Sequence, residues 1–177
     1  MSDEKFDIPE QFASPAVPAL LTEDSVLQFH CHKGISCFNA CCKHADVTLA
    51  PYDVLRLQKH LGMNSEEFLK AHTVPFQIDA DGVPGIKMRT DNDGACLFLD
   101  GENGCSVYEN RPTVCRYYPV ALLNMREKDT YESKQQYSLV REAHCKGHEE
   151  PREITLRDYR KEQGVEEYDE FNRYWYG

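Results

Sequence analysis

The sequence is poor in basic residues and contains no long hydrophobic run. Lysine and arginine number 20 against 30 aspartates and glutamates, which gives a formal net charge of −10. A chain with no net positive field does not attract phosphate groups, so we expect no nucleic-acid partner. No apolar stretch approaches the roughly 18 residues of a membrane-spanning helix, so we expect no membrane partner. Residues 1–7 lack the basic and apolar regions of a signal peptide, and we therefore expect a cytoplasmic protein.

Cysteine is too sparse for a small disulfide-stapled protein, and no C-x-x-C pair occurs. The chain has 8 cysteines in 177 residues, whereas such scaffolds are short and exceed about 8–10% cysteine. A reducing cytoplasm also disfavours lasting disulfides. Metal binding explains the thiols best, and disulfide or redox pairing and simple packing are the alternatives.

The pattern of apolar residues predicts an α+β fold in a single compact, loop-rich domain. We expect short helices and hairpins organised around a cysteine-ligated metal site. An extended N-terminal arm would cover residues 1–24, the metal-binding domain residues 25–150, and a helical tail packed on it residues 151–177. Helical spacing and capping residues predict helices over 52–61, from Asn64, over 156–163 and over 165–176. Alternating or turn-bounded runs predict strands at 74–78 with 85–90, at 95–99 with 105–108, and at 117–123 and 134–141.

The cysteines fall into a dense group followed by a dispersed one. All eight are candidate metal ligands: Cys31, Cys37, Cys41, Cys42, Cys96, Cys105, Cys115 and Cys145. Soft thiolates select zinc, copper(I) or iron–sulfur clusters. Cys37 and Cys41 are one helical turn apart, whereas the adjacent Cys41 and Cys42 would diverge and need not serve the same metal. Two four-thiolate sites, one such site with spare cysteines, and one larger cluster are all possible.

Basic residues are concentrated close to these cysteines. Basic residues within four positions of a cysteine, where a positive charge would lower thiol pKa, include His30, His32, Lys33, Lys43, His44, Arg111, Arg116, His144 and Lys146. Arg116 and Tyr117, directly after Cys115, are candidates for contacts just outside the ligands, where they would tune a bound cofactor. The alternative is that this stretch is simply a turn packed beneath the core.

Four stretches carry a resemblance to a known family. They are CHKGISCFNACC, LAPYDVLRL, CLFLDGENGCSVYENRP and RPTVCRYYP, which fall within residues 31–119. The sequence resembles the YkgJ-type cysteine-cluster family, or CxxCxxCC domain, which implies chelation of zinc or iron. The resemblance carries the ligand role most directly to Cys37, Cys41, Cys42, Cys96, Cys105 and Cys115. The spacing around Cys31 is wider than the short family pattern.

Three functions follow as hypotheses. The first is an iron–sulfur protein, most simply with a [4Fe–4S] cluster, in a redox, sensing or accessory role to an unidentified protein partner. The second is a structural zinc-binding interaction module. The third is a cluster-containing protein-modifying enzyme such as a methyltransferase, because a related cysteine motif occurs in flagellin lysine N-methylase. No catalytic residue and no oligomeric state can be assigned from the sequence.

Overall fold

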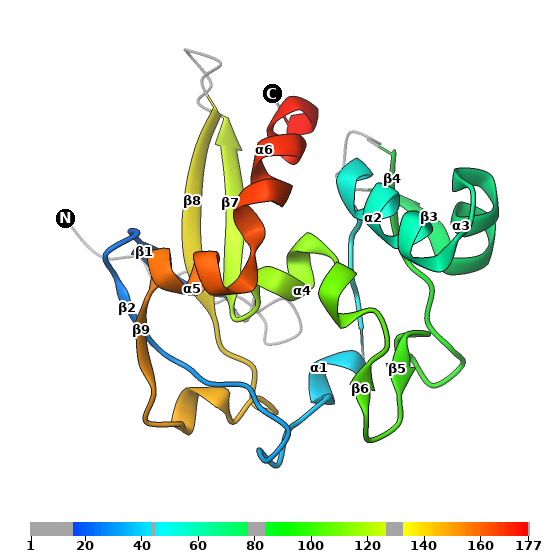
Figure 1. Cartoon of the computed structure of the whole chain (residues 1–177). Coiled ribbons are helices and arrows are strands. Elements are labelled where there is room, and N and C mark those ends of the chain that lie inside the picture. Colours follow the sequence, from blue (N-terminus) through cyan, green and yellow to red (C-terminus); the bar gives the residue numbers. More distant parts are fainter. Residues whose placement is uncertain (1–15, 44, 78–83, 127–132, 177) are drawn as a thin grey trace, which may run out of the picture.

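The structure is a computed structural model that describes residues 16–43, 45–77, 84–126 and 133–176. Across these ranges, six α-helices and nine strands follow one another in short runs of like elements, and the strands pair into four small antiparallel sheets (Figure 1). The predicted α+β class is confirmed. Within the described residues, no helix combines the length and the apolar character needed to cross a bilayer.

The largest sheet has the strand order β1-β8-β7. Strands β7 (Val120–Arg126) and β8 (Ser133–Val140) form a long antiparallel pair, and β1 (Ala16–Leu21) adds to the free edge of β8. The strand predicted from residue 117 begins later, because Thr113–Tyr117 forms the helix α4 instead. Of the expected N-terminal arm, residues 1–15 lie outside the described residues.

Helix α2 (Pro51–Leu61) begins and ends where its capping residues predict, and α3 (Ser65–His72) begins where Asn64 predicts. The proline at the first position of α2 needs no amide partner there, and Gly62 ends the helix with a φ of 67°. Asn64 caps α3: its side chain accepts the Glu67 amide at 3.0 Å, and the Glu67 carboxylate accepts the Asn64 amide at 2.9 Å.

Two short hairpins follow α3. Strands β3 (Thr73–Gln77) and β4 (Pro84–Met88) pair as predicted, and their connection, residues 78–83, lies outside the described residues. The second hairpin is much shorter than predicted. It is reduced to the two-residue strands β5 (Leu99–Asp100) and β6 (Gly104–Cys105) because turns occupy the flanking residues.

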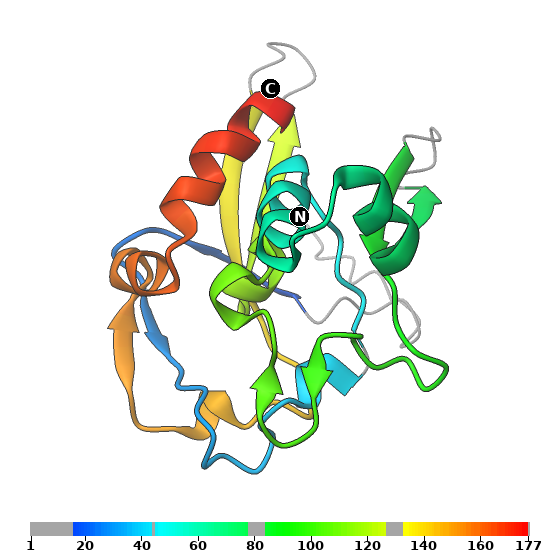
Figure 2. The same ribbon diagram turned by 45° about the vertical axis from the view of Figure 1, so that its right-hand side comes forward.

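The chain ends in a pair of helices, as the sequence predicts. Strand β9 (Glu153–Thr155) pairs with β2 (Val26–Gln28) and leads into α5 (Leu156–Gln163). The Thr155 hydroxyl caps α5 by accepting the Asp158 amide at 3.1 Å, and Gly164 ends it with a φ of 62°. Helix α6 (Val165–Tyr176) then runs beside the β7–β8 pair (Figure 2).

The interior is divided into two hydrophobic cores. The first core lies between β2, β7, α4 and the two C-terminal helices, and it includes Leu27, Phe29, Tyr117, Leu156 and Val165. The second core lies between α2, α3 and the residues that follow them, and it includes Leu57, Phe68, Met88, Phe98 and Val107. Helix α1 (Ala40–Lys43) and the β5–β6 hairpin lie near the end of the molecule away from the tip of the β7–β8 pair (Figures 1 and 2).

Candidate metal centre

All eight cysteines lie in the described part of the chain, and all are free thiols. They occupy turns and very short elements, which can aim side chains from distant parts of the sequence at one region. Cys31 and Cys37 lie in the segment between β2 and α1, Cys41 and Cys42 in α1, Cys96 just before β5, Cys105 in β6, Cys115 in α4, and Cys145 just before a short 3-10 helix, Gly147–Glu149.

Four cysteines line one small cavity of about 40 Å³, and we call them the first cysteine group: Cys31, Cys37, Cys41 and Cys145. The Lys146 amide donates a hydrogen bond to the Cys37 sulfur at 3.1 Å, so the loop that carries Cys145 also supports Cys37. Cys37 lies in a turn and not in a helix, yet its thiol shares the cavity with that of Cys41, as the spacing predicts. The remaining walls are formed by Phe29, Asn39, Tyr118, His144 and Gly147.

The other four cysteines form the second cysteine group: Cys42, Cys96, Cys105 and Cys115. The Cys96 amide donates to the Cys42 carbonyl at 2.8 Å, which fastens the loop before β5 to α1. Burial and the nearby thiols of Cys41, Cys96 and Cys105 together raise the pKa of the Cys115 thiol to about 12. The thiols of Cys96 and Cys115 also raise the pKa of Cys42, so members of this group influence one another although up to 73 positions of sequence separate them.

Cys41 and Cys42 connect the two groups. Their sulfurs lie 3.9 Å apart in the single turn of α1. Cys41 lines the cavity of the first group, while the pKa of Cys42 is raised by its hydrogen bond with Cys41, by burial, and by the thiols of Cys41, Cys96 and Cys115. The two adjacent sulfurs therefore do not diverge as expected, because a separation of 3.9 Å is short enough for both to bind one ion.

The two groups are attached to different hydrophobic cores. Cys145 packs against the first core, whereas Cys96 and Cys105 pack against the second. Ions held by both groups would therefore join two parts of the protein that otherwise have separate interiors.

Burial outweighs the expected lowering of thiol pKa by basic neighbours at most of these cysteines: Arg111 lowers the pKa of Cys105, yet that pKa is raised overall. Burial raises the pKa of Cys31 to about 11 and also raises those of Cys96 and Cys105. Some of the basic side chains are paired with acids: His32 lies 3.3 Å from Glu150, and Lys146 lies 3.0 Å from Glu149. Cys41 is the exception, with a pKa lowered to about 7 by its hydrogen bond with Cys42. A bound cation must therefore supply most of the charge that stabilises the thiolates.

The separations between sulfurs bear on which metal the thiols fit. Four thiolates on one zinc ion, each at about 2.3 Å, are about 3.8 Å from one another. The Cys41–Cys42 pair has this separation, but no three cysteine sulfurs among the described residues lie within 4.8 Å of one another. In a [4Fe–4S] cluster each thiolate binds a different iron ion, so the sulfurs are farther apart. Soft thiols bind both zinc and iron–sulfur clusters, and a single zinc ion would require these sulfurs to move closer.

Arg116 and Tyr117, the two residues expected beside the cofactor, point toward the rest of the fold. The Arg116 guanidinium donates to the carbonyls of Arg111 at 3.1 Å, Gln163 at 2.7 Å and Glu109. The Tyr117 hydroxyl donates to Asp169 at 2.5 Å.

A role for Arg116 and Tyr117 beside a cofactor stays a prediction. Their contacts explain how α4, which carries Cys115, is fixed to the rest of the fold. Tyr118 is the member of this stretch that lines the cavity of the first group. Asn39, which also lines it, has a φ of 67° that the sequence pattern did not reveal.

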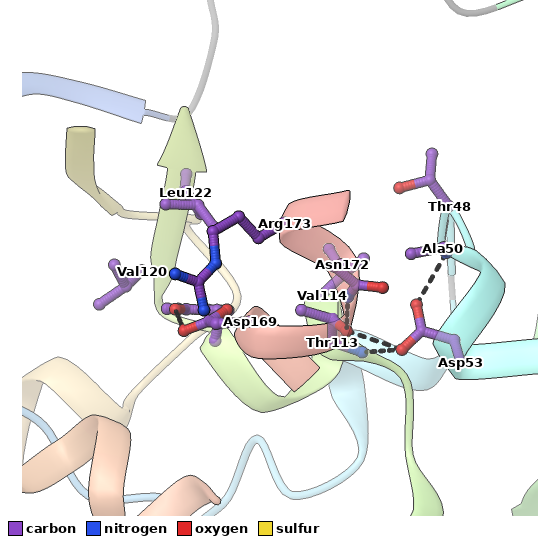
Figure 3. Close-up of a pocket in the computed structure, with 12 residues that line it drawn as sticks. Thr48, Ala50, Asp53, Thr113, Val114, Val120, Leu122, Asp169, Asn172 and Arg173 are labelled. Atoms are coloured by element: carbon purple, nitrogen blue, oxygen red, sulfur yellow. Dashed lines mark hydrogen bonds between the residues drawn. The ribbon is translucent and has the colours of Figure 1, made fainter. Parts of the chain in front are cut away.

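A larger cavity of about 200 Å³ lies on another side of α4 (Figure 3). The Asp53 carboxylate accepts the Ala50 amide at 2.8 Å and both the amide and the hydroxyl of Thr113, and the Thr113 hydroxyl accepts the Asn172 side-chain amide at 3.2 Å. Burial raises the pKa of the Asp53 carboxyl, and these hydrogen bonds and Arg116 oppose that rise. No cysteine is among the residues that line this cavity.

Eight thiols gathered in two adjoining groups on an α+β scaffold are the features of a cysteine-rich metal-binding protein. The chain belongs to the CxxCxxCC family, whose model, described as a putative zinc- or iron-chelating domain, matches residues 30–169 and so spans all eight cysteines. No curated protein and no solved structure matched the chain. The family supports metal binding and does not distinguish zinc from iron.

Proposed function

We propose that this protein holds an iron–sulfur cluster on its cysteines and serves a redox, sensing or accessory role for a protein partner in the cytoplasm. The simplest form is one [4Fe–4S] cluster on four thiolates. The observation that carries the proposal is the spacing of the thiols. They converge from distant parts of the chain, yet no three sulfurs of the described residues come within 4.8 Å, which suits thiolates on separate iron ions better than thiolates on one zinc ion.

A bound cluster would supply reversible transfer of one electron, and backbone amides of this chain would influence its potential. The backbone amides of Phe98 and Val107 lower the pKa of the Cys96 and Cys105 thiols, respectively, against the effect of burial. Amide donors of this kind stabilise negative charge on sulfur, so they would favour the reduced state.

The proposal is tested by purifying the full chain without oxygen and measuring its absorption spectrum, iron, acid-labile sulfide and zinc. A brown protein with about four iron and four sulfide ions per chain is the expected result for one [4Fe–4S] cluster. A colourless protein with stoichiometric zinc and no sulfide would overturn it.

A structural zinc module is the second candidate, and one distance favours it. The Cys41 and Cys42 sulfurs, 3.9 Å apart, are already at the separation expected for two thiolates on one zinc ion. The same metal analysis decides between the two. A third candidate, protein modification such as methyl transfer, is addressed by titrating S-adenosylmethionine into the purified protein: tight binding would favour the enzyme, and absence of binding would count against it.

A further inference from the structure

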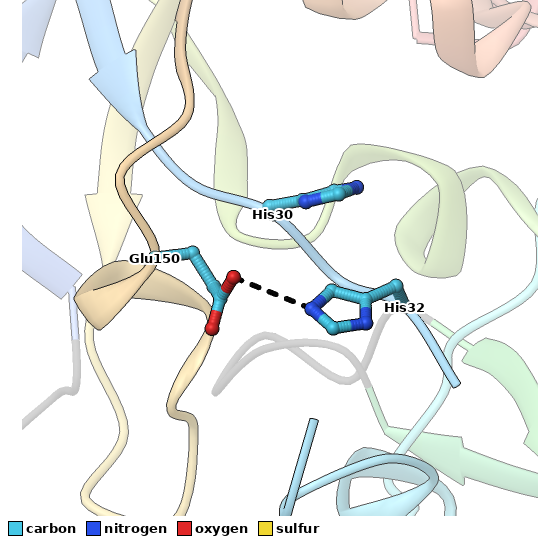
Figure 4. Close-up of side chains that lie close together, drawn as sticks. All are labelled: His30, His32 and Glu150. Carbon is cyan, nitrogen blue, oxygen red and sulfur yellow. Dashed lines mark hydrogen bonds and ion pairs between the residues drawn. The ribbon is translucent and has the colours of Figure 1, made fainter. Parts of the chain in front are cut away.

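Two histidines and a glutamate form a group of possible metal ligands that contains no cysteine. His30 and His32 lie on either side of Cys31 in the segment after β2, and Glu150 follows the 3-10 helix that ends at Glu149 (Figure 4). One donor atom from each of the three residues lies within 4.8 Å of the other two. We propose that His30, His32 and Glu150 bind one divalent transition-metal ion, at a site separate from the cysteine groups.

The backbone places the two imidazoles together and the intervening thiol elsewhere. The amides of Phe29 and His30 donate to the carbonyls of Arg152 and Gly147, both at 3.0 Å, so the chain beyond β2 stays paired with the segment that carries Glu150. The His30 and His32 rings have centroids 4.7 Å apart. Cys31 lines the cavity of the first cysteine group, and neither histidine does. The histidine–glutamate site and the first cysteine group therefore have different surroundings, although both take a residue from positions 30–32.

The distances suit a single ion of ordinary size. The His32 Nε2 atom lies 3.3 Å from the Glu150 Oε2 atom. Nitrogen and oxygen ligands at about 2.0–2.2 Å from a tetrahedral ion are about 3.4 Å apart. All three residues are partly exposed, so their side chains are accessible to an ion from solvent and can close the remaining gap to His30 by rotation.

The donor set determines the kind of ion. Two imidazoles and one carboxylate are borderline ligands that bind Fe²⁺, Co²⁺, Ni²⁺ or Zn²⁺, whereas thiolates prefer softer centres. Three protein ligands leave at least one coordination position open to water or to a further molecule, which is the arrangement of catalytic and not of purely structural ions. The site would thus be able to exchange its ion or its outer ligand.

The hydrogen bonds of the His32 ring show which ring proton the proposed metal ion would replace. The Gly34 amide donates to the Nδ1 atom of His32 at 3.1 Å, so the proton of the neutral ring is on Nε2 and is shared with Glu150. When Nε2 binds the ion, the ring proton moves to Nδ1 and the hydrogen bond from Gly34 is lost. The Glu150 carboxylate, already oriented toward Nε2, then binds the ion in place of that proton.

Titration with cobalt(II) tests this site, because the absorption of bound cobalt shows whether a cysteine thiolate is one of its ligands. The full chain, isolated with its cysteine-bound metal, is titrated with Co²⁺ while its absorption is recorded. One additional equivalent should bind with weak visible bands and no new sulfur-to-cobalt charge-transfer absorption, because no thiolate is a ligand. Glu150→Gln, which keeps a hydrogen-bond acceptor for His32, and His32→Ala should each weaken this binding at least about tenfold, since loss of a mere supporting residue costs roughly that much.

His60→Ala is the matched control. His60 is an exposed histidine in the last turn of α2, and among the described residues it belongs to no group of three candidate ligands within 4.8 Å of one another. This variant should bind the additional cobalt as the parent does.

Three results would overturn the site: no additional equivalent, an additional equivalent with intense sulfur-to-cobalt absorption, or full binding in both Glu150→Gln and His32→Ala. Circular dichroism verifies that the variants are folded. None of these results depends on whether the cysteines hold iron or zinc.

Discussion

The Asp53 carboxylate accepts both the amide and the hydroxyl of Thr113, at 2.8 and 2.7 Å. The two residues are 60 positions apart, and their contact joins the first turn of α2 to the first residue of α4. Cys115 lies two residues further along α4. A buried carboxylate in one helix thus positions a candidate metal ligand in another.

Asp53→Ala should therefore destabilise the protein strongly. The Asp53 side chain is 1% exposed, and its removal leaves the Ala50 and Thr113 amides without their acceptor. Each buried unsatisfied donor costs about 1–3 kcal/mol, so we expect the free energy of unfolding to fall by about 3 kcal/mol or more. Urea denaturation measures it. Asp46→Ala, which removes an exposed carboxylate paired with Lys87, should change stability little, and an equal loss in both variants would contradict the argument.

Arg116→Met should also destabilise the fold. The guanidinium donates to three backbone carbonyls and lies 4.4 Å from the centre of the Tyr168 ring, so methionine leaves those carbonyls unsatisfied at a buried site. We expect a loss of about 3 kcal/mol in denaturant unfolding. Arg157→Met removes a solvent-exposed arginine that pairs with Glu23 and Asp24, and it should have no comparable effect. A normal stability with an altered spectrum of the bound metal would instead favour the predicted cofactor-tuning role of Arg116.

Serine substitutions should distinguish the two cysteine groups. Cys145→Ser removes a candidate ligand that packs on the first core, and Cys105→Ser removes a candidate ligand that packs on the second. If only one cysteine group binds metal, the variant in that group loses its metal and the other variant retains it. If both groups bind metal, each variant loses part of its metal. Metal analysis combined with native mass spectrometry measures the remaining content. Complete loss of metal in both variants would show that the eight thiols act as one site.

His72 should make stability depend on pH near neutrality. Burial, together with the positive charge of Arg89, lowers the pKa of His72 below its ordinary value of 6.5. The unfolded chain then binds a proton before the folded one does, so stability is fully present above about pH 6.5 and is lost as the pH falls below it.

Phenylalanine at position 72 isolates this effect. The His72 ring packs against Phe68 and Phe98, with centroids 5.4 and 4.9 Å apart, and an aromatic replacement can keep this packing. His72→Phe should lose less stability than the parent between about pH 7 and pH 5, as measured by urea unfolding at each pH. Identical pH profiles for the two proteins would refute the prediction.

Local sequence signals predicted the helices better than the hairpins. Asn64 with Glu67, and Thr155 with Asp158, satisfy the first amides of their helices through side chains three positions away, so neighbouring residues alone specify the start of each helix. Helix α4 was missed, because it has only five residues and no capping side chain of its own. Helix α4 is held by Asp53 and by backbone carbonyls of other segments. Because these contacts join residues far apart in the sequence, they produce no local sequence pattern.

The sequence by itself determined the eight thiols, the shortage of positive charge in the chain as a whole and the membership of a metal-chelating family, because residue type and spacing alone carry that chemistry. Only the tertiary structure decided how the thiols are grouped. Cys31, Cys37 and Cys41 share a cavity with Cys145, more than 100 positions away, while Cys42 turns toward the loop of Cys96. The reason is physical: the position of a loop cysteine is set by the cores on which its loop packs, and those cores form from residues remote in sequence.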